Sequence, residues 1–310
     1  MHRLSEAVGG ASAVVRLAAV VVALAMLPAI ACGQQQHADS SFRPTVPHPA
    51  YVANGPVVAV DQAHRNFHTL DGKYAPFGKL LSADGYRVRP NTEAFSAQSL
   101  AGVNVLVVSN ALPSTPGMSA FTPDEIAAVR QWVQNGGALL LIADHAPFGT
   151  ASALLSQAFG VDMGAGFVVV RQYGKLTANI DYRKAQLGSH PIMQGRNPSE
   201  QVKAVESFTG QSLGIPPGAT GLLLLPNDAV GVASPQAIDM LRRGESVPGK
   251  RVGGRAQAEA LNFGRGRVVI TGEAAMFTEQ VFPWGERAGL TAEDDEQFAL
   301  NVLHWLSRLI

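Results

Sequence analysis

The chain has 310 residues, of which 46% are hydrophobic and 15% are charged, so it is long and apolar enough to bury one large core. Lys and Arg together number 24, as do Asp and Glu, and this balance leaves no basic field of the kind that binds nucleic acid. The single cysteine excludes an intramolecular disulfide and a cysteine-rich zinc site. We therefore expect a globular domain that is held together by packing and does not bind nucleic acid.

Residues 1–31 have the pattern of a signal peptide. Arg3 and Arg16 precede the apolar run LAAVVVALAMLPAIA, which has the length of a secretory hydrophobic region and is shorter than the roughly 20 residues that span a bilayer. The Ala-Ile-Ala run at 29–31 fits a cleavage site, and Cys32 follows directly, as in lipoproteins whose cysteine is acylated. An alanine stands where lipoprotein signals usually carry Leu. The pattern predicts export to the periplasm or cell envelope, with lipidation at Cys32 as a membrane anchor or, alternatively, simple secretion.

The chain after Cys32 divides into a tether and a folded domain. Residues 32–54 are polar and Pro-rich without periodicity, which is typical of a tether. The domain is predicted to span 55–310. Buried strands are expected at 56–61, 103–110, 138–144 and 267–273, a short strand at 86–90, and helices at 77–85, 122–135 and 291–310.

Two of the predicted helices carry start signals. Thr122 and Glu125 form a capping box, with Pro123 at the first helical position, and Thr291 is the expected cap of the last helix. Phe298, Val302, Leu306 and Leu309 are expected to share one face of that helix, and Trp305 to lie in the core.

The middle of the domain, from about 160 to 260, has a less regular pattern. Strands are expected at 167–170, 202–208, 219–225 and 229–234, several of them close enough to form hairpins, followed by a polar loop at 240–255. Together the alternating strands and helices predict an α/β domain with a mostly parallel sheet that is covered on both faces.

Three loops at the carboxyl ends of the predicted strands are unusually polar, and ligands of open α/β sheets bind at this edge. The candidate catalytic residues are Asp144, His145 and Glu273; the candidate ligand-binding residues are Asp61, His64, Asn66, His68 and Phe148. Imidazole and carboxylate together suit acid–base chemistry or a divalent metal, with His64, His68 and His145 as its ligands. If residues 64–68 are helical, His64 and His68 share a face.

A purely structural interpretation accounts for the same residues. Asp144 would then be a helix cap, His145 would bind a loop carbonyl, and Asp61 would tie two loops together. No spacing among them is a specific metal signature. The pattern supports a pocket for a small polar ligand more firmly than it supports a metal.

The segments VAVDQAHRNFHTLDGKYAPFGKLLSADGY and FTPDEIAAVRQWVQNGGALLLIADHAPFG resemble DUF4350, a bacterial domain family within the class I glutamine amidotransferase-like superfamily. SHPIMQG (189–195) and GRGRVVITGEAAMFTE (264–279) extend the resemblance over most of 55–308. It implies a flavodoxin-like three-layer sandwich but no activity. The context of His190 is similar to that in sugar-related members of the superfamily.

The resemblance also shows a departure. Amidotransferases of this superfamily carry a nucleophilic cysteine on the turn after the strand that corresponds to 138–144, and this turn carries Asp144 and His145 here. With no cysteine beyond Cys32, glutaminase chemistry through a thioester is excluded. Two hypotheses follow: an envelope hydrolase or isomerase that acts on a small polar substrate such as a carbohydrate, by metal or acid–base chemistry, and a non-catalytic envelope binding or scaffold lipoprotein.

Overall fold

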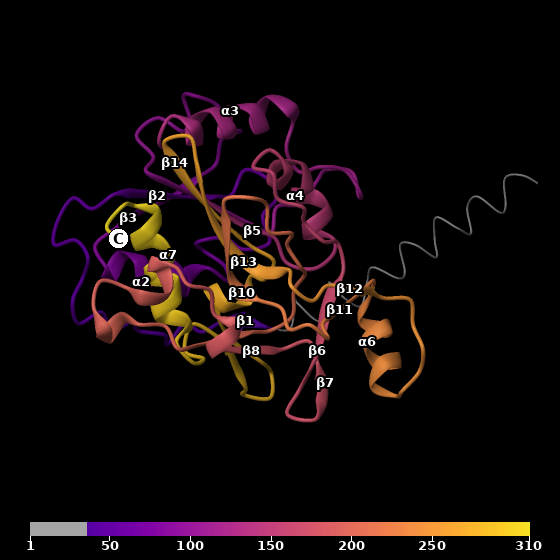
Figure 1. Ribbon diagram of the computed structural model, residues 1–310. Coiled ribbons are helices and arrows are strands. Elements are labelled where there is room, and N and C mark those ends of the chain that lie inside the picture. Colours follow the sequence, from indigo (N-terminus) through magenta and orange to yellow (C-terminus); the bar gives the residue numbers. More distant parts are fainter. Residues whose placement is uncertain (1–35) are drawn as a thin grey trace, which may run out of the picture.

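The computed structural model describes residues 36–310 (Figure 1). The predicted signal peptide, its cleavage site and Cys32 lie outside these residues. The central sheet is formed by β2 (Val57–Asp61), β3 (Arg87–Asn91), β4 (Val105–Ser109), β5 (Ala138–Ile142), β10 (Ala219–Leu224), β13 (Ala256–Phe263) and β14 (Gly266–Thr271). These seven strands lie in the order β10-β13-β14-β5-β4-β2-β3.

Most of this sheet is parallel, as predicted. Five neighbouring strands pair in parallel, in the order β3-β2-β4-β5-β14. If these five are numbered by their order along the chain, the order in the sheet is 2-1-3-4-5. β13 turns back antiparallel to β14, and β10 is antiparallel to β13. All carboxyl ends of the five parallel strands therefore meet at one edge.

Helices cover both faces of the sheet. α2 (Ala75–Ala83) and α7 (Asp295–Leu306) lie on one face, and α3 (Pro123–Gln134) and α4 (Phe148–Gln157) lie on the other (Figure 1). The capping box at α3 is confirmed, because Thr122 accepts a hydrogen bond from the Glu125 amide at 3.3 Å and donates its own amide to Glu125 Oε2 at 3.0 Å.

Smaller sheets surround the central one. They contain β1 (His37–Ala38), β6 (Phe167–Gln172), β7 (Lys175–Thr177), β8 (Ile180–Arg183), β9 (Ala204–Ser207), β11 (Val230–Val232), β12 (Lys250–Arg251), β15 (Glu279–Val281) and β16 (Arg287–Gly289). Two short helices, α5 (Pro191–Gln194) and α6 (Pro235–Arg242), lie between them in the chain.

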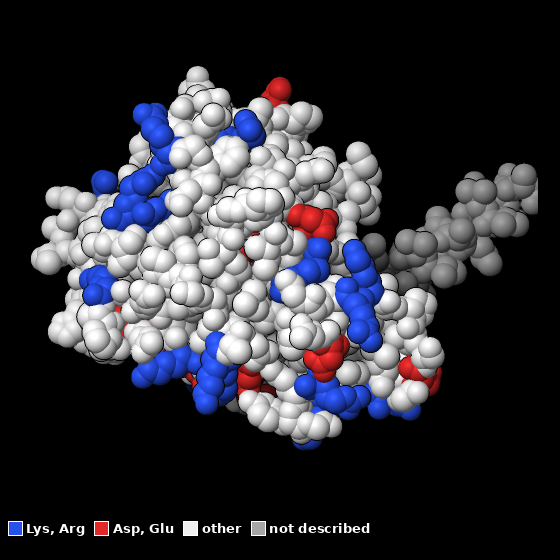
Figure 2. All heavy atoms as spheres, viewed as in Figure 1, with Lys and Arg blue, Asp and Glu red and all other residues white. Residues whose placement is uncertain are grey.

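Both charge signs occur on the face shown in Figure 2, where basic side chains are the more widespread. Across residues 36–310, no helix has the length and apolar character needed to cross a membrane.

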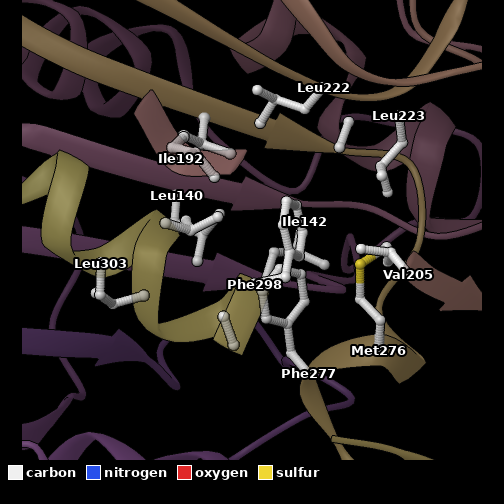
Figure 3. Close-up of a cluster of buried hydrophobic side chains, with 14 of the residues drawn as sticks. Leu140, Ile142, Ile192, Val205, Leu222, Leu223, Met276, Phe277, Phe298 and Leu303 are labelled. Carbon is white, nitrogen blue, oxygen red and sulfur yellow. The ribbon is translucent and has the colours of Figure 1, made fainter. Parts of the chain in front are cut away.

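The core lies in two layers that are separated by the sheet. In β5, Leu140 and Ile142 pack with residues of α2 and α7, whereas Leu139 and Leu141 pack with residues of α3 and α4. Figure 3 shows the first layer, where side chains of β5 meet those of α7. This alternation is the pattern of a parallel strand that is buried on both faces, and it explains why β5 reads as an unbroken apolar run.

The middle of the chain pairs differently from the expectation. β9 pairs with β8, β10 with β13, and β11 with β6, so the expected hairpins among 202–234 are wrong. The sequence also gave no prediction for β13 or α4. The segment AQAEALNF of β13 is rich in Ala and contains few of the β-branched and aromatic residues that mark strands. The predicted loop at 240–255 includes the end of α6 and all of β12.

The last helix begins and ends inside its predicted limits. Asp294 occupies its N-cap position, whereas Thr291 binds Glu279 through both its amide (2.9 Å) and its hydroxyl (2.7 Å), so the prediction of Thr291 as the cap is wrong. The helix ends at Leu306, and Leu309 beyond it is 38% exposed rather than on the buried face. Trp305 lies in the core, as predicted.

Part of the segment that was expected to be a tether is packed against the domain. β1 pairs with β15, Asp39 is buried, and Phe42 is only 6% exposed within the first core layer. The folded unit therefore begins well before residue 55. Because this segment has no periodicity, its few anchoring residues gave no signal in the sequence.

Candidate functional site

Polar side chains gather at the carboxyl ends of the parallel strands. Asp61 ends β2, Asn91 ends β3 and Ser109 ends β4, while Asp144 and Glu273 each lie two residues beyond β5 and β14. All five side chains are buried. Burying a polar group costs free energy unless the group is hydrogen-bonded or its charge is paired. The partners of each side chain therefore determine what it can do.

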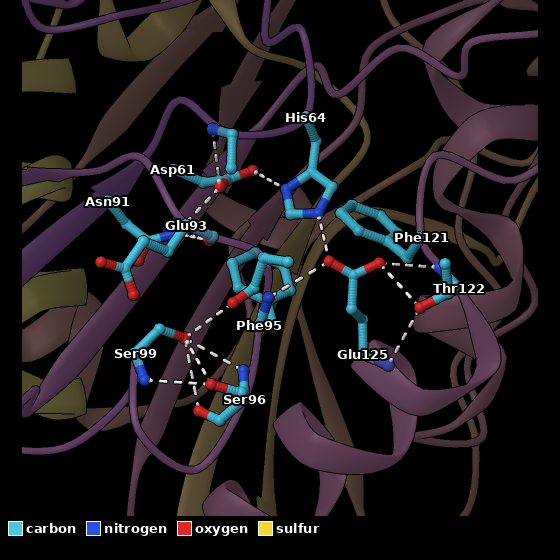
Figure 4. A network of polar contacts seen from close by, with 12 residues as sticks. Asp61, His64, Asn91, Glu93, Phe95, Ser96, Ser99, Phe121, Thr122 and Glu125 are labelled. Carbon is cyan, nitrogen blue, oxygen red and sulfur yellow. Dashed lines mark hydrogen bonds and ion pairs between the residues drawn. The ribbon is translucent and has the colours of Figure 1, made fainter.

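At the β2 end, His64 bridges two carboxylates (Figure 4). Its Nδ1 lies 2.8 Å from Asp61 Oδ2, and its Nε2 lies 2.8 Å from Glu125 Oε1 on the first turn of α3. The rings of Phe95 and Phe121 lie 4.5 and 4.8 Å from the imidazole, centroid to centroid. Both ring nitrogens are thus in use, so His64 ties β2 to α3 and has no atom left for a metal or a ligand.

The charges in this bridge support one another. Burial acts against the charged imidazole, but the bonds and charges of Asp61 and Glu125 outweigh it and raise the pKa of His64 above its ordinary value. Burial likewise acts to raise the pKa of Glu125, but the Thr122 amide and His64 lower it to about 2. Asp61 also accepts from Asn91 Nδ2 at 3.4 Å, and so joins two loops as the structural interpretation required.

Beside this bridge, Asn66 and His68 both bind Ser109 at the end of β4. Asn66 donates to the Ser109 carbonyl (3.1 Å) and accepts from the His64 amide (3.0 Å). His68 Nδ1 lies 3.1 Å from Ser109 Oγ, and its ring stacks on Tyr74 with centroids 4.7 Å apart. Burial, reinforced by the charge of Lys73, lowers the pKa of His68 to about 3, so this ring is neutral at physiological pH.

The proposed sharing of a metal by three histidines is not supported by their positions. Residues 62–69 form bends rather than a helix, so His64 and His68 do not share a helical face. His64 lies between carboxylates, His68 on Tyr74, and His145 on Phe167, with centroids 4.3 Å apart in the last pair. Within the described chain, no group of three or more His, Cys, Asp or Glu side chains is placed to hold a metal ion.

At the β5 end, Asp144 and His145 form an adjacent pair that is partly open. The Asp144 side chain is 11% exposed and that of His145 21% exposed. Asp144 Oδ1 accepts from the His145 amide at 2.7 Å, and His145 Nδ1 donates to the Ala146 carbonyl at 2.9 Å. The carbonyl contact fits the structural interpretation of His145, but Asp144 is not a helix cap, because Pro147 occupies that position of α4.

Glu273 follows the neighbouring strand, β14, and lies close enough to Asp144 for the charge of Asp144 to act on it. It is fully buried, and its oxygens accept hydrogen bonds from the amides of Ala275 (2.6 Å) and Met276 (2.9 Å). Burial, with the negative charge of Asp144, raises the pKa of Glu273 to about 8. A buried carboxyl group of raised pKa near a second carboxyl group is a combination used in acid–base catalysis, but the oxygens of Glu273 are bound by amides of its own loop.

The three predicted loops do converge, through aromatic residues of which the sequence singled out only Phe148, and that as a ligand-binding residue. The Tyr74 hydroxyl accepts from Ser109 Oγ at 2.9 Å and donates to the Ala274 carbonyl at 3.3 Å, which joins β4 to the loop after β14. Phe148 lies against Phe67, with ring centroids 5.7 Å apart. Aromatic packing and backbone contacts, rather than a shared ligand, bring these loops together.

A cavity of about 400 Å³ lies beside the Asp144–His145 pair. Its walls include Asp162, Met163, Gly164, Ala165, Gly166, Phe167, Val168, Gln211, Ser212, Gly231, Val232, Ala233, Lys250, Val252 and Arg255. Phe167, whose ring stacks on His145, forms part of the wall. The cavity therefore adjoins the strand-end site at that ring, although neither Asp144 nor His145 is among its lining residues.

Gln211 connects the cavity to the strand ends more directly. Its Nε2 donates to the carbonyls of Ala143 (2.7 Å) and Asp144 (3.0 Å), so it holds the turn after β5. Its Oε1 finds no hydrogen-bond partner in the part of the chain that the structure describes, although the residue is only 1% exposed. No pattern in the sequence marks Gln211, because it lies in an irregular segment with no motif around it.

Comparisons with known proteins agree with this α/β architecture. The profile of DUF4350, a domain of unknown function, matches residues 74–303. No curated protein matches the chain. Among solved structures, the mmIFT52 N-terminal domain is similar with a TM-score of 0.57 and 14% identity over 81% of this chain and 97% of that one.

A protein from Bacteroides uniformis, described as ThuA-like, covers 85% of this chain and 94% of its own, with 11% identity and a TM-score of 0.42. At such identities, the likeness to the mmIFT52 domain indicates a shared fold and says nothing of activity.

Proposed function

The chain belongs to the DUF4350 family, and from the chemistry of its cavity we propose that it binds a small, hydroxyl-rich ligand such as a carbohydrate. The observation that carries the proposal is the make-up of the cavity wall, which combines the N–H donors of Lys250 and Arg255 with the apolar surface of Phe167. Gln211 also lines the cavity, and its amide nitrogen links that wall to the turn of Asp144.

The remaining walls suit the two kinds of surface that a sugar presents. Phe167, Val232 and Val252 offer apolar contact to the C–H face of a pyranose ring. Lys250 and Arg255 offer N–H donors to hydroxyl oxygens. The Arg255 guanidinium is held in place by Asp162 Oδ2 at 2.8 Å, so it is already oriented before a ligand arrives.

Binding is a better fit to the geometry than catalysis. The two strongest titratable candidates, His64 and Glu273, direct their nitrogen and oxygen atoms to groups of the protein itself. The alternative is an acid–base hydrolase, and the raised pKa of Glu273 near Asp144 favours it. In that case Asp144→Asn would abolish turnover of a nitrophenyl glycoside, whereas a binding protein shows no turnover to lose.

We place the domain, at a finer level, in the flavodoxin-like class of three-layer sandwiches and in the class I glutamine amidotransferase-like superfamily. The order of the five parallel strands supports this placement. Numbered along the chain, they lie as 2-1-3-4-5, which is the order of flavodoxin-like sheets. The only cysteine of the chain is Cys32, so the proposed function does not include thioester chemistry.

We also propose that the domain acts outside the cytoplasm. The signal pattern at 1–31 supports export, and Cys32 supports a lipid anchor in the cell envelope. Fractionation of cells that express the wild type and Cys32→Ser tests the anchor: acylation predicts that the wild type enters the membrane fraction and that the variant does not.

The binding proposal is tested by titrating D-glucose, D-mannose and myo-inositol into the protein, with heat release or ligand-observed NMR as the readout. Ala165→Trp places a large ring at the cavity wall from an exposed position, and we expect it to weaken binding by at least about tenfold. Ala97→Trp, at another exposed position, is the matched control and should bind as the wild type does. If none of the three polyols binds the wild type, or if both tryptophan variants bind equally well, the proposal is wrong.

A further inference from the structure

We propose that the end of the β15–β16 hairpin contacts the membrane surface to which Cys32 anchors the domain, with Trp284 seated in the lipid headgroup region. The inference rests on the proposed lipid anchor at Cys32, and it adds the face that the folded domain turns toward the bilayer. It uses no residue of the cavity at Phe167, so it is independent of the proposed carbohydrate ligand.

The hairpin end carries an exposed aromatic pair. Trp284 is 66% exposed, and the Phe282 ring lies 4.9 Å from it, centroid to centroid. The Phe282 amide donates to the Glu286 carbonyl at 2.8 Å and closes the turn, while Trp284 Nε1 donates to Glu286 Oε2, also at 2.8 Å. The indole N–H is therefore satisfied by the hairpin itself, and the apolar ring faces solvent. Such amphipathic rings favour the interface between a membrane and water.

The start of the described chain places this hairpin end close to Cys32. β1 pairs antiparallel with β15, and His37 lies opposite Val281, the last residue of β15 before the turn. Cys32 lies outside the described residues, but only five residue steps separate it from His37, and an extended chain covers at most about 18 Å in five steps. A lipid on Cys32 therefore holds the bilayer within reach of the hairpin end.

A second hairpin presents an aromatic ring on the same side of the domain. Tyr173 and Gly174 form the two-residue turn between β6 and β7, and Tyr173 is 77% exposed. Its φ is +51°, which favours Asn, Asp or Gly, so the turn geometry alone does not explain a tyrosine here. The β6–β7 hairpin protrudes at the bottom of the view in Figure 1, where the golden β15–β16 segment also protrudes.

Hydrogen bonds and charges connect the two aromatic ends to a common neighbour. The Tyr173 hydroxyl donates to Asp181 Oδ2 at 2.9 Å, and Trp284 binds Glu286. Burial raises the pKa of Glu206, and the negative charges of Asp181 and Glu286 raise it further. Because both carboxylates are close enough to act on Glu206, the two hairpin ends lie near one another.

Basic side chains flank the second aromatic ring. Arg171 and Lys175 are exposed on β6 and β7, one on each side of the turn at Tyr173. Long cationic side chains beside tyrosine and tryptophan are typical of membrane interfaces, because their stems lie against apolar surface while their charges reach the lipid phosphates. Together with the short connection to Cys32, these cations favour a lipid surface over a protein partner.

The test tethers the domain to a membrane through its own cysteine and does not rely on acylation in a cell. The mature chain, residues 32–310, contains every element of the described fold, and Cys32 is its only cysteine. Its thiol is coupled to maleimide headgroups in vesicles of three parts phosphatidylcholine to one part phosphatidylglycerol. Tryptophan emission is compared between vesicles with ordinary and with brominated acyl chains, because bromine quenches a tryptophan only at close contact.

Two variants assign the quenching. The wild type has three tryptophans, and we expect brominated lipid to remove up to the share of one of them from the emission. Trp284→Phe should abolish this quenching. Trp132→Phe is the matched control and should retain it, because Trp132 lies on α3, at the opposite side of the domain from the β6–β7 hairpin in Figure 1.

The second hairpin is tested by moving the reporter in the Trp284→Phe chain. Tyr173→Trp places a tryptophan at the β6–β7 turn and should restore the quenching. Leu154→Trp places one at a 53% exposed position on α4 and should not. Both positions are exposed, so neither substitution disturbs the core.

Three outcomes overturn the inference. An unquenched wild type would mean that the hairpin end stays in water, and would leave its rings to a protein partner. Equal quenching in the wild type and Trp284→Phe would assign the contact to another tryptophan. Quenching of Leu154→Trp that equals or exceeds that of Tyr173→Trp would mean that the tethered domain turns no preferred face to the bilayer. Failure of the lipid anchor itself would appear instead in the fractionation of Cys32→Ser, on which this measurement does not depend.

Discussion

At the β2 end of the sheet, the ring of His64 is enclosed by Phe95 and Phe121 and both of its nitrogens bind carboxylates. At the β5 end, the ring of His145 stacks on Phe167 beside a cavity, and its side chain is 21% exposed. The two loops have similar composition, yet one is a closed structural bridge and the other adjoins space for a ligand. An Asp/His-rich strand end can therefore serve as a site only where neighbouring segments leave it open.

The largest loss of stability is expected from a substitution of His64. His64→Ala leaves the Asp61 and Glu125 carboxylates buried without their shared partner, and we expect the free energy of unfolding to fall by about 3–5 kcal/mol. Urea denaturation at neutral pH measures this loss. His37→Ala, at an exposed position on β1, should change it by less than about 0.5 kcal/mol, and a similar small loss for His64→Ala would contradict the bridge.

The closed bridge should also respond to acid. The pKa of Glu125 is lowered from 4.5 to about 2 in the folded state, so its contribution is present above pH 4.5 and is lost as the pH falls toward 2. This corresponds to about 3 kcal/mol of unfolding free energy. Denaturation series at several pH values should show this fall in the wild type and a flatter profile in Glu125→Gln. Parallel profiles for the two proteins would contradict the attribution of this loss of stability to Glu125.

Glu273, at the neighbouring β14 end, should show the opposite dependence on pH. The pKa of Glu273 is raised to about 8 in the folded state, so the unfolded chain loses this proton at lower pH and stability falls as the pH rises from about 4.5 to about 8. Glu273→Gln has no carboxyl group to ionise. Its free energy of unfolding should therefore fall over this interval by at least about 1 kcal/mol less than that of the wild type. Thermal melts of both proteins across the interval provide the measurement, and identical slopes would argue that Glu273 ionises normally.

The smallest effect on stability is expected at His145. His145→Ala removes a ring that is partly exposed and stacks on Phe167, so the free energy of unfolding should fall by about 1 kcal/mol or less. Denaturation beside His64→Ala checks the contrast directly. A loss as large as that of His64→Ala would mean that the β5 end is as closed as the β2 end.

Several features were accessible from the sequence because their causes are local. The buried strands are recognisable in the sequence as apolar runs. The start of α3 is marked by Thr122, Pro123 and Glu125, whose contacts lie within one turn. The gathering of Asp61, Asp144 and Glu273 at one edge also followed from the alternation of strands and helices, because parallel strands place their carboxyl ends together.

The sequence alone therefore determined the class of fold, the edge on which its polar residues lie, and the absence of a cysteine nucleophile from the domain. Only the tertiary structure decided that Glu125 would bind the second nitrogen of His64, that Gln211 would join the β5 turn to a cavity, and that His37 would lie beside Val281 near the hairpin end. These contacts join residues far apart in the chain. Hydrophobic periodicity specifies which face of an element is buried, but it does not specify which distant loop fills or leaves open the space beside it.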